Sequence, residues 1–493
     1  MPLSSDGVRM YVCGLTPSAE AHLGHARSFM FFDVLRRYLV HLGFRVTYVR
    51  NVTDIDDRSI AAGTAEGVPW SEIIARYDAS FRRSMDRLHL LQPDHEPRVT
   101  QYVPDIVTMI ERLVAAGNAY AAGDGVYYAV ASFPRYGALS GRNTAELLIG
   151  ARIAPGEDKR DPLDFALWKL AKPGEPAWPS PWGNGRPGWH IECSAMSHAL
   201  LGEPFDIHGG GYDLVFPHHE NEIAQTEALF GPPMANVWMH GGLLQFDGKK
   251  MSKSLGNFEP LSTLLDRHDP QAIRLLFLQA GYRKPLNFTE ASIDGATVGL
   301  RRLQAAYDAL RTASPVTHDD ATLPTDVAAY ERRFFAALDD DMNTAGAVSV
   351  LFDLAAVGND VVRSGAASRA AAFEHQALTL LGLSPTERTH LARAVVETAQ
   401  RTAGANGFVI RGPANADDLL PASALATLSR RLAGRLALNG ESPAQVVVRV
   451  ILERQNAKER KEYALADEFR QALHGIGIAL KDSKEGVTWS VGA

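Results

Sequence analysis

The 493-residue sequence predicts an α/β fold, in which an open parallel sheet is split by an insertion and followed by a mostly α-helical C-terminal half. Three observations lead to this class. A strand, a helix and a strand follow one another over residues 9–52, and sheet-like segments resume at 190–193, 205–208 and 237–240. After Asn257 the apolar residues keep helical spacing almost throughout. A strand–helix–strand run of this length forms a unit with parallel strands.

The first elements can be assigned one by one. We expect strands at Arg9–Cys13 and Arg45–Val52, the second of which is rich in β-branched and aromatic residues. Between them a helix is expected over 24–42, because large apolar residues recur at helical spacing and Gly43 follows as a stop. Residues 71–118 are amphipathic and are expected to be helical.

The middle of the chain changes character. Residues 119–188 contain a short strand at 126–130 and a passage rich in Gly, Pro and Trp, which we interpret as an insertion into the sheet domain. Residues 385–440 have few large apolar groups and are weakly specified. From Gln445 a long charged helix leads into a small tail.

Length and composition set limits on the class of protein. A chain of 493 residues is too long for one core, so we expect about three to five structural units. Its 46% hydrophobic and 22% charged residues are typical of soluble globular proteins, and no apolar run of about 18 residues predicts a membrane span. Two cysteines exclude a disulfide framework and suit a reducing cytosol, and the start lacks the layout of a secretory signal. A net charge of −7 argues against indiscriminate nucleic-acid binding but permits a structured RNA partner.

His22, Gly24 and His25 (His-Leu-Gly-His) lie where a loop becomes a helix. Backbone N–H groups and the positive helix end then point at phosphate, and imidazole N–H groups can bind phosphate oxygens as charge builds. The alternative is a helix start that carries two histidines by chance.

Lys250 and Lys253 lie in the Gly- and Ser-flanked segment GKKMSKSLGN. Such a segment can close over pyrophosphate and deliver two ammonium groups, although a lone string of this kind is more often an exposed basic turn. Together with His-Leu-Gly-His it predicts that a carboxylate attacks the α-phosphorus of ATP, with Mg-ATP as the substrate.

A glycine run, His208–Gly211, follows a predicted strand. Ligands bind at strand ends in open α/β sheets, so Gly209 and Gly210 are expected to lie under adenine and Asp213 to accept from ribose hydroxyls. The alternative is a glycine-rich turn without a ligand.

Four dispersed residues can form a metal site. Cys13 is expected to end the first strand and Cys193 a later parallel strand, which would place both thiols at one sheet edge; His218 and Glu222 are four residues apart and face the same way on a helix. Two sulfurs, an imidazole and a carboxylate are a credible Zn²⁺ set. The alternative is two buried, inert cysteines. A bound Zn²⁺ would favour a substrate thiol over a serine hydroxyl, which gives selectivity without an editing domain.

Taken together, these segments resemble the bacterial cysteinyl-tRNA synthetases, a family of class I aminoacyl-tRNA synthetases, over nearly the whole length. The matching strings are MYVCGLT, HLGHARSFMFFDVLRRYL, YVRNVTDIDD, DFALWK, GRPGWHIECSAMS, DIHGGGYDLVFPHHENEIAQ, KMSKSLGN, DDDMNTAGAVSVLFDL, ALADEFR and GIALKD. The resemblance implies ATP-dependent activation of L-cysteine and transfer to tRNA(Cys) by a cytoplasmic enzyme, expected to be a monomer with no membrane partner.

The resemblance also assigns roles to residues. It implies that Cys13, Cys193, His218 and Glu222 bind one Zn²⁺ per chain and that Lys253 binds ATP. The residues that it places around the substrate cysteine are Thr16, Thr53, Trp189 and His208. In the tail it places Asp467 and Asp482 at the anticodon, where Tyr463 and Trp489 can stack on bases. Lys458 stands where the family usually has arginine, so one bidentate base contact is expected to be weaker.

By the same resemblance the fold is a Rossmann-type catalytic domain split by a connective insertion. The implied domains are the two catalytic halves 1–118 and 189–257, the insertion 119–188, a stem-contact segment 258–300, a helical bundle 301–384, the poorly specified region 385–440 and an anticodon-binding domain 441–493. Family members usually have a further strand and turn before MYVCG, whereas nine residues precede Met10, so we expect a misassigned start or a missing edge strand.

Two other functions fit part of the sequence. The first is a ligase that joins cysteine to an amino-sugar, as in mycothiol synthesis, which would share both sites but would not need ALADEFR…GIALKD. The second is a catalytically inactive synthetase paralogue kept for RNA contacts, against which both phosphate motifs and all four metal-binding residues argue.

Overall fold

The computed structural model describes residues 2–4, 7–142, 158–246, 249–250, 259–312, 326–358, 361, 366–383, 409–411, 428, 432, 443–476, 478–483 and 486–491. The chain divides into two compact units, Met1–Leu383 and Ser384–Ala493. Within the described ranges, no helix is long and apolar enough to cross a bilayer. The finer domain limits expected from the sequence stay predictions.

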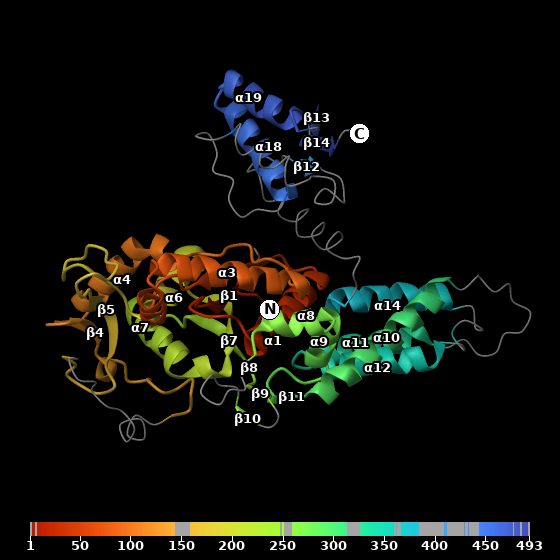
Figure 1. Ribbon diagram of the computed structural model, residues 1–493, viewed down its shortest axis with the longest axis horizontal. Coiled ribbons are helices and arrows are strands. Elements are labelled where there is room, and N and C mark those ends of the chain that lie inside the picture. Colours follow the sequence, from red (N-terminus) through yellow and green to blue (C-terminus); the bar gives the residue numbers. More distant parts are fainter. Residues whose placement is uncertain are drawn as a thin grey trace, which may run out of the picture. The chain divides into compact units, whose positions relative to one another are not determined.

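The first unit is built around a parallel sheet with the strand order β2-β1-β7-β8 (Figure 1). Its strands are β1 (Val8–Leu15), β2 (Val46–Val52), β7 (Phe205–Gly211) and β8 (Ala235–Gly241), and all three pairings are parallel. This confirms the predicted α/β class. The strand order changes direction between β1 and β7, so the carboxyl ends of these two strands flank the point at which open α/β sheets bind ligands.

Strand β1 separates two hydrophobic cores. Met10 and Val12 pack into one core together with helix α1, whereas Tyr11 and Cys13 pack into the other with the insertion. Successive side chains of a strand point to opposite faces, so this alternation follows from the sequence of β1. Cys13 is thereby directed away from α1 and toward the helices of the second core.

Helix α1 (Leu23–His41) begins after His22 and ends before Gly43, whose φ of 88° is easily adopted only by glycine. It packs against β7 at Gly209, where a Cβ atom would lie 2.2 Å from Cζ of Phe32. A glycine is therefore required at 209 for helix–sheet packing, whether or not a nucleotide binds there.

Two predicted elements differ from the structure. The stretch 71–118 contains the helices α3 (Trp70–Arg87) and α4 (Val103–Ala115), but most of the segment between them is not helical and bridges strand β2 at His95 and Arg98. The strand expected at 190–193 is wrong, because Trp189–Leu201 forms helix α6. Short apolar runs fit a strand or a buried helix equally well, and here the packing of α6 against α4 and α7 selects the helix.

The insertion forms a separate antiparallel sheet in the order β3-β4-β5-β6. Its strands are β3 (Ala119–Ala122), β4 (Gly125–Tyr128), β5 (Phe165–Leu170) and β6 (Gly185–Pro187). The chain returns from β6 directly into α6, so the insertion leads into the site at the sheet edge. In Figure 1 its orange strands lie at the end of the unit remote from the blue-green helices α10–α14.

The rest of the first unit is helical apart from a small sheet. The helices are α2 (Asp57–Glu66), α7 (Glu220–Phe230), α8 (Leu261–Arg267), α9 (Pro270–Leu278), α10 (Glu290–Thr312), α11 (Val327–Asp339), α12 (Thr344–Ala356) and α14 (Ala367–Leu381). The small sheet has the order β10-β9-β11, with β9 (Leu244–Phe246), β10 (Lys249–Lys250) and β11 (Leu286–Phe288).

The second unit has its own small core. Helices α18 (Pro443–Glu459) and α19 (Tyr463–His474) precede the antiparallel strands β13 (Ile478–Ser483) and β14 (Gly486–Val491), and β12 (Val409–Arg411) pairs with β14 in parallel. The single long helix expected from Gln445 is therefore two helices. Most of 385–440, the region expected to be poorly specified, lies outside the described residues.

Candidate active site and metal centre

Six side chains meet at the carboxyl ends of β1 and β7, and we call this set the metal cluster. Cys13 comes from β1 and His208 from β7, Cys193 from α6, His218 and His219 from the turn η4 (Val215–His219), and Glu222 from the first turn of α7. All six are buried. Cys193 thus reaches the sheet edge from a helix, which corrects the expectation that it ends a parallel strand.

The four residues expected to bind metal lie together. Their ligand atoms are all within 4.8 Å of one another. The Sγ atoms of Cys13 and Cys193 are 3.8 Å apart, Sγ of Cys13 lies 3.4 Å from Oε1 of Glu222, and Nε2 of His218 lies 3.0 Å from the same oxygen. A tetrahedral zinc site with bonds of 2.0–2.3 Å separates its ligand atoms by about 3.3–3.8 Å, so the four residues are compatible with a metal site without large rearrangement.

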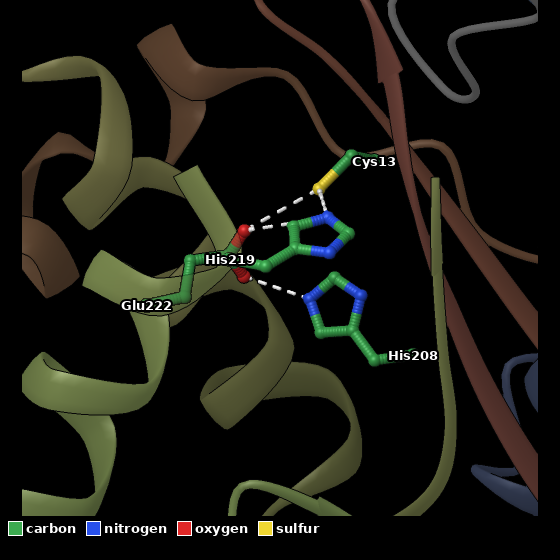
Figure 2. A group of neighbouring side chains, drawn as sticks. All are labelled: Cys13, His208, His219 and Glu222. Atoms are coloured by element: carbon green, nitrogen blue, oxygen red, sulfur yellow. Dashed lines mark hydrogen bonds and ion pairs between the residues drawn. The ribbon is translucent and has the colours of Figure 1, made fainter. Parts of the chain in front are cut away.

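A second group shares two of these residues, and Figure 2 shows it. Cys13, His208, His219 and Glu222 also bring their ligand atoms within 4.8 Å of one another. Nε2 of His219 lies 3.3 Å from Sγ of Cys13, and Nε2 of His208 lies 2.7 Å from Oε2 of Glu222. Cys13 and Glu222 are therefore common to two possible metal positions. Sequence reasoning missed His219, although the adjacent histidines in HHENE were a usable signal.

The electrostatics of the cluster favour a cation. Hydrogen bonding from Cys13 lowers the pKa of Cys193 to about 6, while burial and the contact with Cys193 raise the pKa of Cys13 well above its usual value. Burial alone would lower the pKa of His218, but Glu222 and Cys193 raise it to about 10. Burial opposes ionisation of Glu222, yet His208 and His218 hold its pKa well below the usual range. Negative charge is thus concentrated in a buried place, where, among the described residues, histidine protons and shared thiol protons balance it.

Three further groups, the buried Asn51 and the half-buried His190 and His240, contact the cluster, and these too were not expected from the sequence. His190 lies 2.9 Å from His218, Nδ1 to Nδ1, and His240 lies 2.8 Å from Nδ1 of His219. Oδ1 of Asn51 accepts from the Gly14 N–H at 2.8 Å and lies 3.7 Å from Sγ of Cys193. Ring nitrogens bonded in this way fix how each imidazole presents its other nitrogen to a metal.

The residues expected around the substrate cysteine differ in whether they contact the metal cluster. The ring of Trp189 lies 4.3 Å from that of His218 and is 41% exposed, so it borders the cluster on the open side. Thr53 is buried and donates to Glu192 at 3.0 Å, beside Cys193 in sequence. His208 is in the cluster itself, and its Nδ1 is buried without a hydrogen-bond partner in the described part of the chain. Thr16 directly follows β1 and makes no hydrogen bond to the cluster among the described residues.

The His-Leu-Gly-His turn is held by hydrogen bonds between its histidine side chains and its own backbone N–H groups. Nδ1 of His22 accepts from the Gly24 N–H at 3.1 Å, and Nδ1 of His25 accepts from the His22 N–H at 3.2 Å, while the two rings stack at 3.9 Å. Burial, followed by the charges of His22 and Arg58, lowers the pKa of His25 to about 3, so this ring is neutral. A neutral imidazole that accepts at Nδ1 carries its proton at Nε2. This turn therefore offers Nε2–H as a donor at the helix N-terminus.

Of the other residues expected to bind the nucleotide, Gly209, Gly210 and Asp213 lie at or just after the carboxyl end of β7. Gly209 and Gly210 are the last but two and last but one residues of β7, and Asp213 is exposed in the following turn η3 (Tyr212–Leu214). A Cβ atom on Gly210 would lie 3.0 Å from Cε1 of His219, so this glycine makes room for the metal cluster. The backbone of Lys250 pairs with Gln245 in the small sheet, and Lys253 lies outside the described residues.

The residues expected to contact the anticodon are in the second unit. Tyr463 is 67% exposed at the first position of α19, Asp467 is exposed one turn later, and Lys458 lies near the end of α18. Asp482 and Trp489 lie in β13 and β14, opposite Val487 and Leu480 respectively; the placement of their side chains is outside the description.

Two family descriptions match the sequence. Residues 1–298 match the family described as tRNA synthetases class I (C) catalytic domain, and residues 333–383 match the DALR domain. The chain is 44% identical to the cysteine–tRNA ligase of Alkalilimnicola ehrlichii over 489 residues, which cover 99% of this chain and 96% of that one. It is 43% identical to the cysteine–tRNA ligase of Geobacter sulfurreducens over 492 residues, with coverage of 98% and 95%.

Solved structures agree on the fold. The methionyl-tRNA synthetase of Mycobacterium tuberculosis bound by methionyl-adenylate superposes with a TM-score of 0.58 at 14% identity, covering 81% of this chain and 95% of that one. The Agrobacterium radiobacter LeuRS, in a ternary complex with tRNA and LeuAMS, gives 0.59 at 13% identity, covering 100% and 97%. At these identities the likeness shows the class I synthetase fold alone. The full-length matches go further, and the chain belongs to the cysteine–tRNA ligase family of class I aminoacyl-tRNA synthetases.

Proposed function

We propose that this chain activates L-cysteine with Mg-ATP to cysteinyl-adenylate and pyrophosphate, and then transfers cysteine to the 3′-terminal adenosine of tRNA(Cys). The observation that carries the proposal is the juxtaposition of two buried thiols, a histidine and a glutamate with the His-Leu-Gly-His turn at one edge of the parallel sheet. A site for sulfur chemistry and a site for phosphate would then lie at the same edge of the sheet.

Cys13, Cys193, His218 and Glu222 would hold Zn²⁺, one ion per chain. A zinc ion supplies a soft Lewis acid that lowers the pKa of a thiol and prefers sulfur to a hydroxyl oxygen. We favour this set over the one with His208 and His219 because it contains both thiols. Trp189, next to His218 and partly exposed, would border the substrate side chain, with Thr16, Thr53 and His208 around it.

On the nucleotide side, the Nε2–H group of His25, with His22 and the amides of the α1 N-terminus, would donate to phosphate oxygens as the α-phosphorus is attacked. Lys250 and Lys253 would neutralise the leaving pyrophosphate, and Gly209, Gly210 and Asp213 would accept adenine and ribose. A ribose hydroxyl of the tRNA end, the 2′-OH in this class, would then take the cysteinyl group.

The second unit would read the anticodon through residues of α18, α19 and the β13–β14 pair, namely Lys458, Tyr463, Asp467, Asp482 and Trp489. Exposed tyrosine is suited to stacking on an unpaired base. We further propose that the protein works as a monomer in the cytoplasm.

Amino-acid-dependent ATP–pyrophosphate exchange, measured across all twenty amino acids, tests the first step, and charging of tRNA(Cys) tests the second. Exchange should depend on cysteine alone, and charging should not occur with other tRNAs. Cysteine transfer to glucosamine-inositol without tRNA charging would favour the amino-sugar ligase instead, and absent exchange would identify an inactive paralogue.

The choice between the two metal positions can be tested by measuring the bound zinc of two variants. His218→Ala should lose bound zinc, whereas His219→Ala should retain most of it, since His219 belongs only to the second group. The reverse order of zinc loss would move the ion to the His208 and His219 side.

A further inference from the structure

Arg27, in the second turn of α1, is a buried cation bound to backbone carbonyls from two different segments. Its Nη1 donates to the carbonyl oxygens of Gly242 at 3.0 Å and Leu243 at 3.1 Å, and its Nη2 donates to those of Gly281 at 3.3 Å and Lys284 at 2.6 Å. Arg27 is 5% exposed, and no carboxylate of the described residues pairs with it. Burial lowers its pKa to about 10, which still leaves it charged at neutral pH.

These two segments are the stems of the small sheet β10-β9-β11. Residues 242–243 connect β8 to β9, and residues 279–285 connect α9 to β11. The stems also bond each other directly, from the Gly242 N–H to the Tyr282 carbonyl at 2.6 Å and from the Leu286 N–H to the Leu243 carbonyl at 3.0 Å. The small sheet in turn contains Lys250, at the start of the KMSKS sequence.

Two residues of the stems, Gly242 and Tyr282, allow the stems to lie close to each other and to helix α1. A Cβ atom on Gly242 would lie 2.5 Å from the carbonyl oxygen of Lys284 and 2.6 Å from that of Arg283, so only glycine lets the carbonyls converge. The ring of Tyr282 stacks on Phe31, one turn after Arg27 on α1, with centroids 3.9 Å apart and planes at 11°. Helix α1 therefore holds the stems by charge at one turn and by an aromatic contact at the next.

We propose that Arg27 is a positioning residue, which fixes the sheet that contains Lys250, where the KMSKS sequence begins, relative to the helix N-terminus that carries His22 and His25. The proposal rests on the proposed function, because it assumes that both motifs act on one ATP. The planar guanidinium has five donors in a fixed fork and can serve four carbonyls on two segments at once, whereas a lysine ammonium with three donors cannot. Displacement of reacting groups by about 1 Å can cost about 100-fold in rate.

The test is a double-mutant cycle between Arg27→Lys and Lys253→Ala in cysteine-dependent pyrophosphate exchange, expressed per active site by titration of the adenylate formed. Arg27→Lys alone should lower kcat about 10- to 100-fold with the KM for cysteine changed less than about twofold. In the Lys253→Ala background the same change should cost less than about threefold, because one of the two lysines of the segment that this sheet leads into is already absent. Equal losses in both backgrounds would overturn the proposal.

Two further variants keep the outcome clear. Arg36→Lys is the matched control, since Arg36 is on the same helix, is buried, and donates to the Gln92 carbonyl at 2.6 Å and to Asp94 at 2.7 Å, away from the stems. It should lower Tm while kcat per active site stays constant. If Arg27→Lys does not fold, Gly242→Ala separates the stems while keeping the guanidinium, and its kcat loss should likewise vanish with Lys253→Ala; additive losses there would again contradict us. Absence of exchange in the unaltered protein would instead overturn the proposed function.

Discussion

Two buried polar clusters of the first unit differ in how their charges are balanced. In the ion-pair cluster of Asp33, Arg37 and Arg274, one oxygen of Asp33 accepts from Nε of Arg37 at 2.9 Å and from Arg274, and the other accepts from the Leu91 N–H at 2.8 Å. Burial alone would raise the pKa of Asp33, but the two arginines hold it below its usual value. Every polar atom of the carboxylate has a protein partner.

The metal cluster is the opposite case. Two thiols and a carboxylate share a buried space with histidines, and Nδ1 of His208 has no hydrogen-bond partner among the described residues. Its charge is balanced only if histidine and thiol protons are retained. A cluster whose charges are all paired within the protein joins elements to one another, whereas a cluster with unpaired acidic groups is compatible with a bound cation.

The largest expected effect is that of Cys193→Ser, which removes a sulfur from the metal cluster. Mutation of a residue that only contacts a metal ligand typically lowers metal affinity or activity about 10- to 100-fold. Loss of a ligand itself should therefore lower kcat/KM for cysteine at least about 100-fold, with loss of bound zinc and of the preference for cysteine over serine. Exchange with both amino acids and elemental analysis measure this. The control Ser194→Ala removes the neighbouring hydroxyl, which donates to Gln225 at 2.8 Å, and should leave zinc in place. Unchanged selectivity in Cys193→Ser would contradict the zinc role.

The ion-pair cluster should respond in the opposite way. Arg274 is fully buried and also donates to the carbonyls of Leu381 at 2.6 Å and Leu88 at 3.1 Å, so it joins α9 to α14 and to the segment after α3. Arg274→Met should lower the free energy of unfolding by about 3–5 kcal/mol, measured in urea, with exchange per active site changed only a few-fold. A large loss of kcat at wild-type stability would show that the ion-pair cluster serves catalysis, which would contradict the purely structural role that we assign to it.

A third buried carboxylate, that of Glu374, has neither arginine partners nor histidine and thiol partners among the described residues. Both oxygens of Glu374, on α14, are buried without a hydrogen bond among the described residues, and burial raises the pKa of its carboxyl to about 8. The folded state then keeps a proton that the unfolded state loses, so stability falls as pH rises from about 4.5 to about 8.

Glu374→Gln should remove this dependence and stabilise the protein at pH 8 by about 1–3 kcal/mol, with little gain at pH 4.5. Thermal unfolding of both proteins across this pH range measures the difference. The control is Glu331→Gln, which changes a partly exposed carboxylate next to Arg369 in the same bundle and should have a far smaller effect. Parallel pH profiles for Glu374→Gln and the unaltered protein would mean that the carboxylate has a partner after all.

Much of the fold followed from local patterns. The helix expected over 24–42 is α1, and the strands around it pair in parallel, because apolar spacing and the stop at Gly43 are local signals. Cys193 was assigned to a strand because a short apolar run does not reveal its period, and only packing against α4 and α7 makes it helical.

Less of the site than of the fold could be predicted from the sequence. Spacing alone gave no metal pattern for Cys13 and Cys193, which are 180 residues apart, and the family resemblance supplied it. The four-residue spacing to Glu222 selected His218 and passed over His219, although the turn η4, with Phe216 extended at φ −139° and ψ 131°, brings both rings to Glu222. Arg27 had no signal, since its partners are backbone carbonyls far along the chain.

In the proposed function, the metal cluster holds a zinc ion that selects the substrate thiol. The direct measurement is the ratio of cysteine- to serine-dependent exchange, taken together with zinc content, before chelation, after chelation and after zinc is restored. We predict one zinc per chain, a ratio that collapses when the metal is removed, and its recovery on addition of zinc. A metal-free protein that still prefers cysteine over serine by the same ratio would contradict the account.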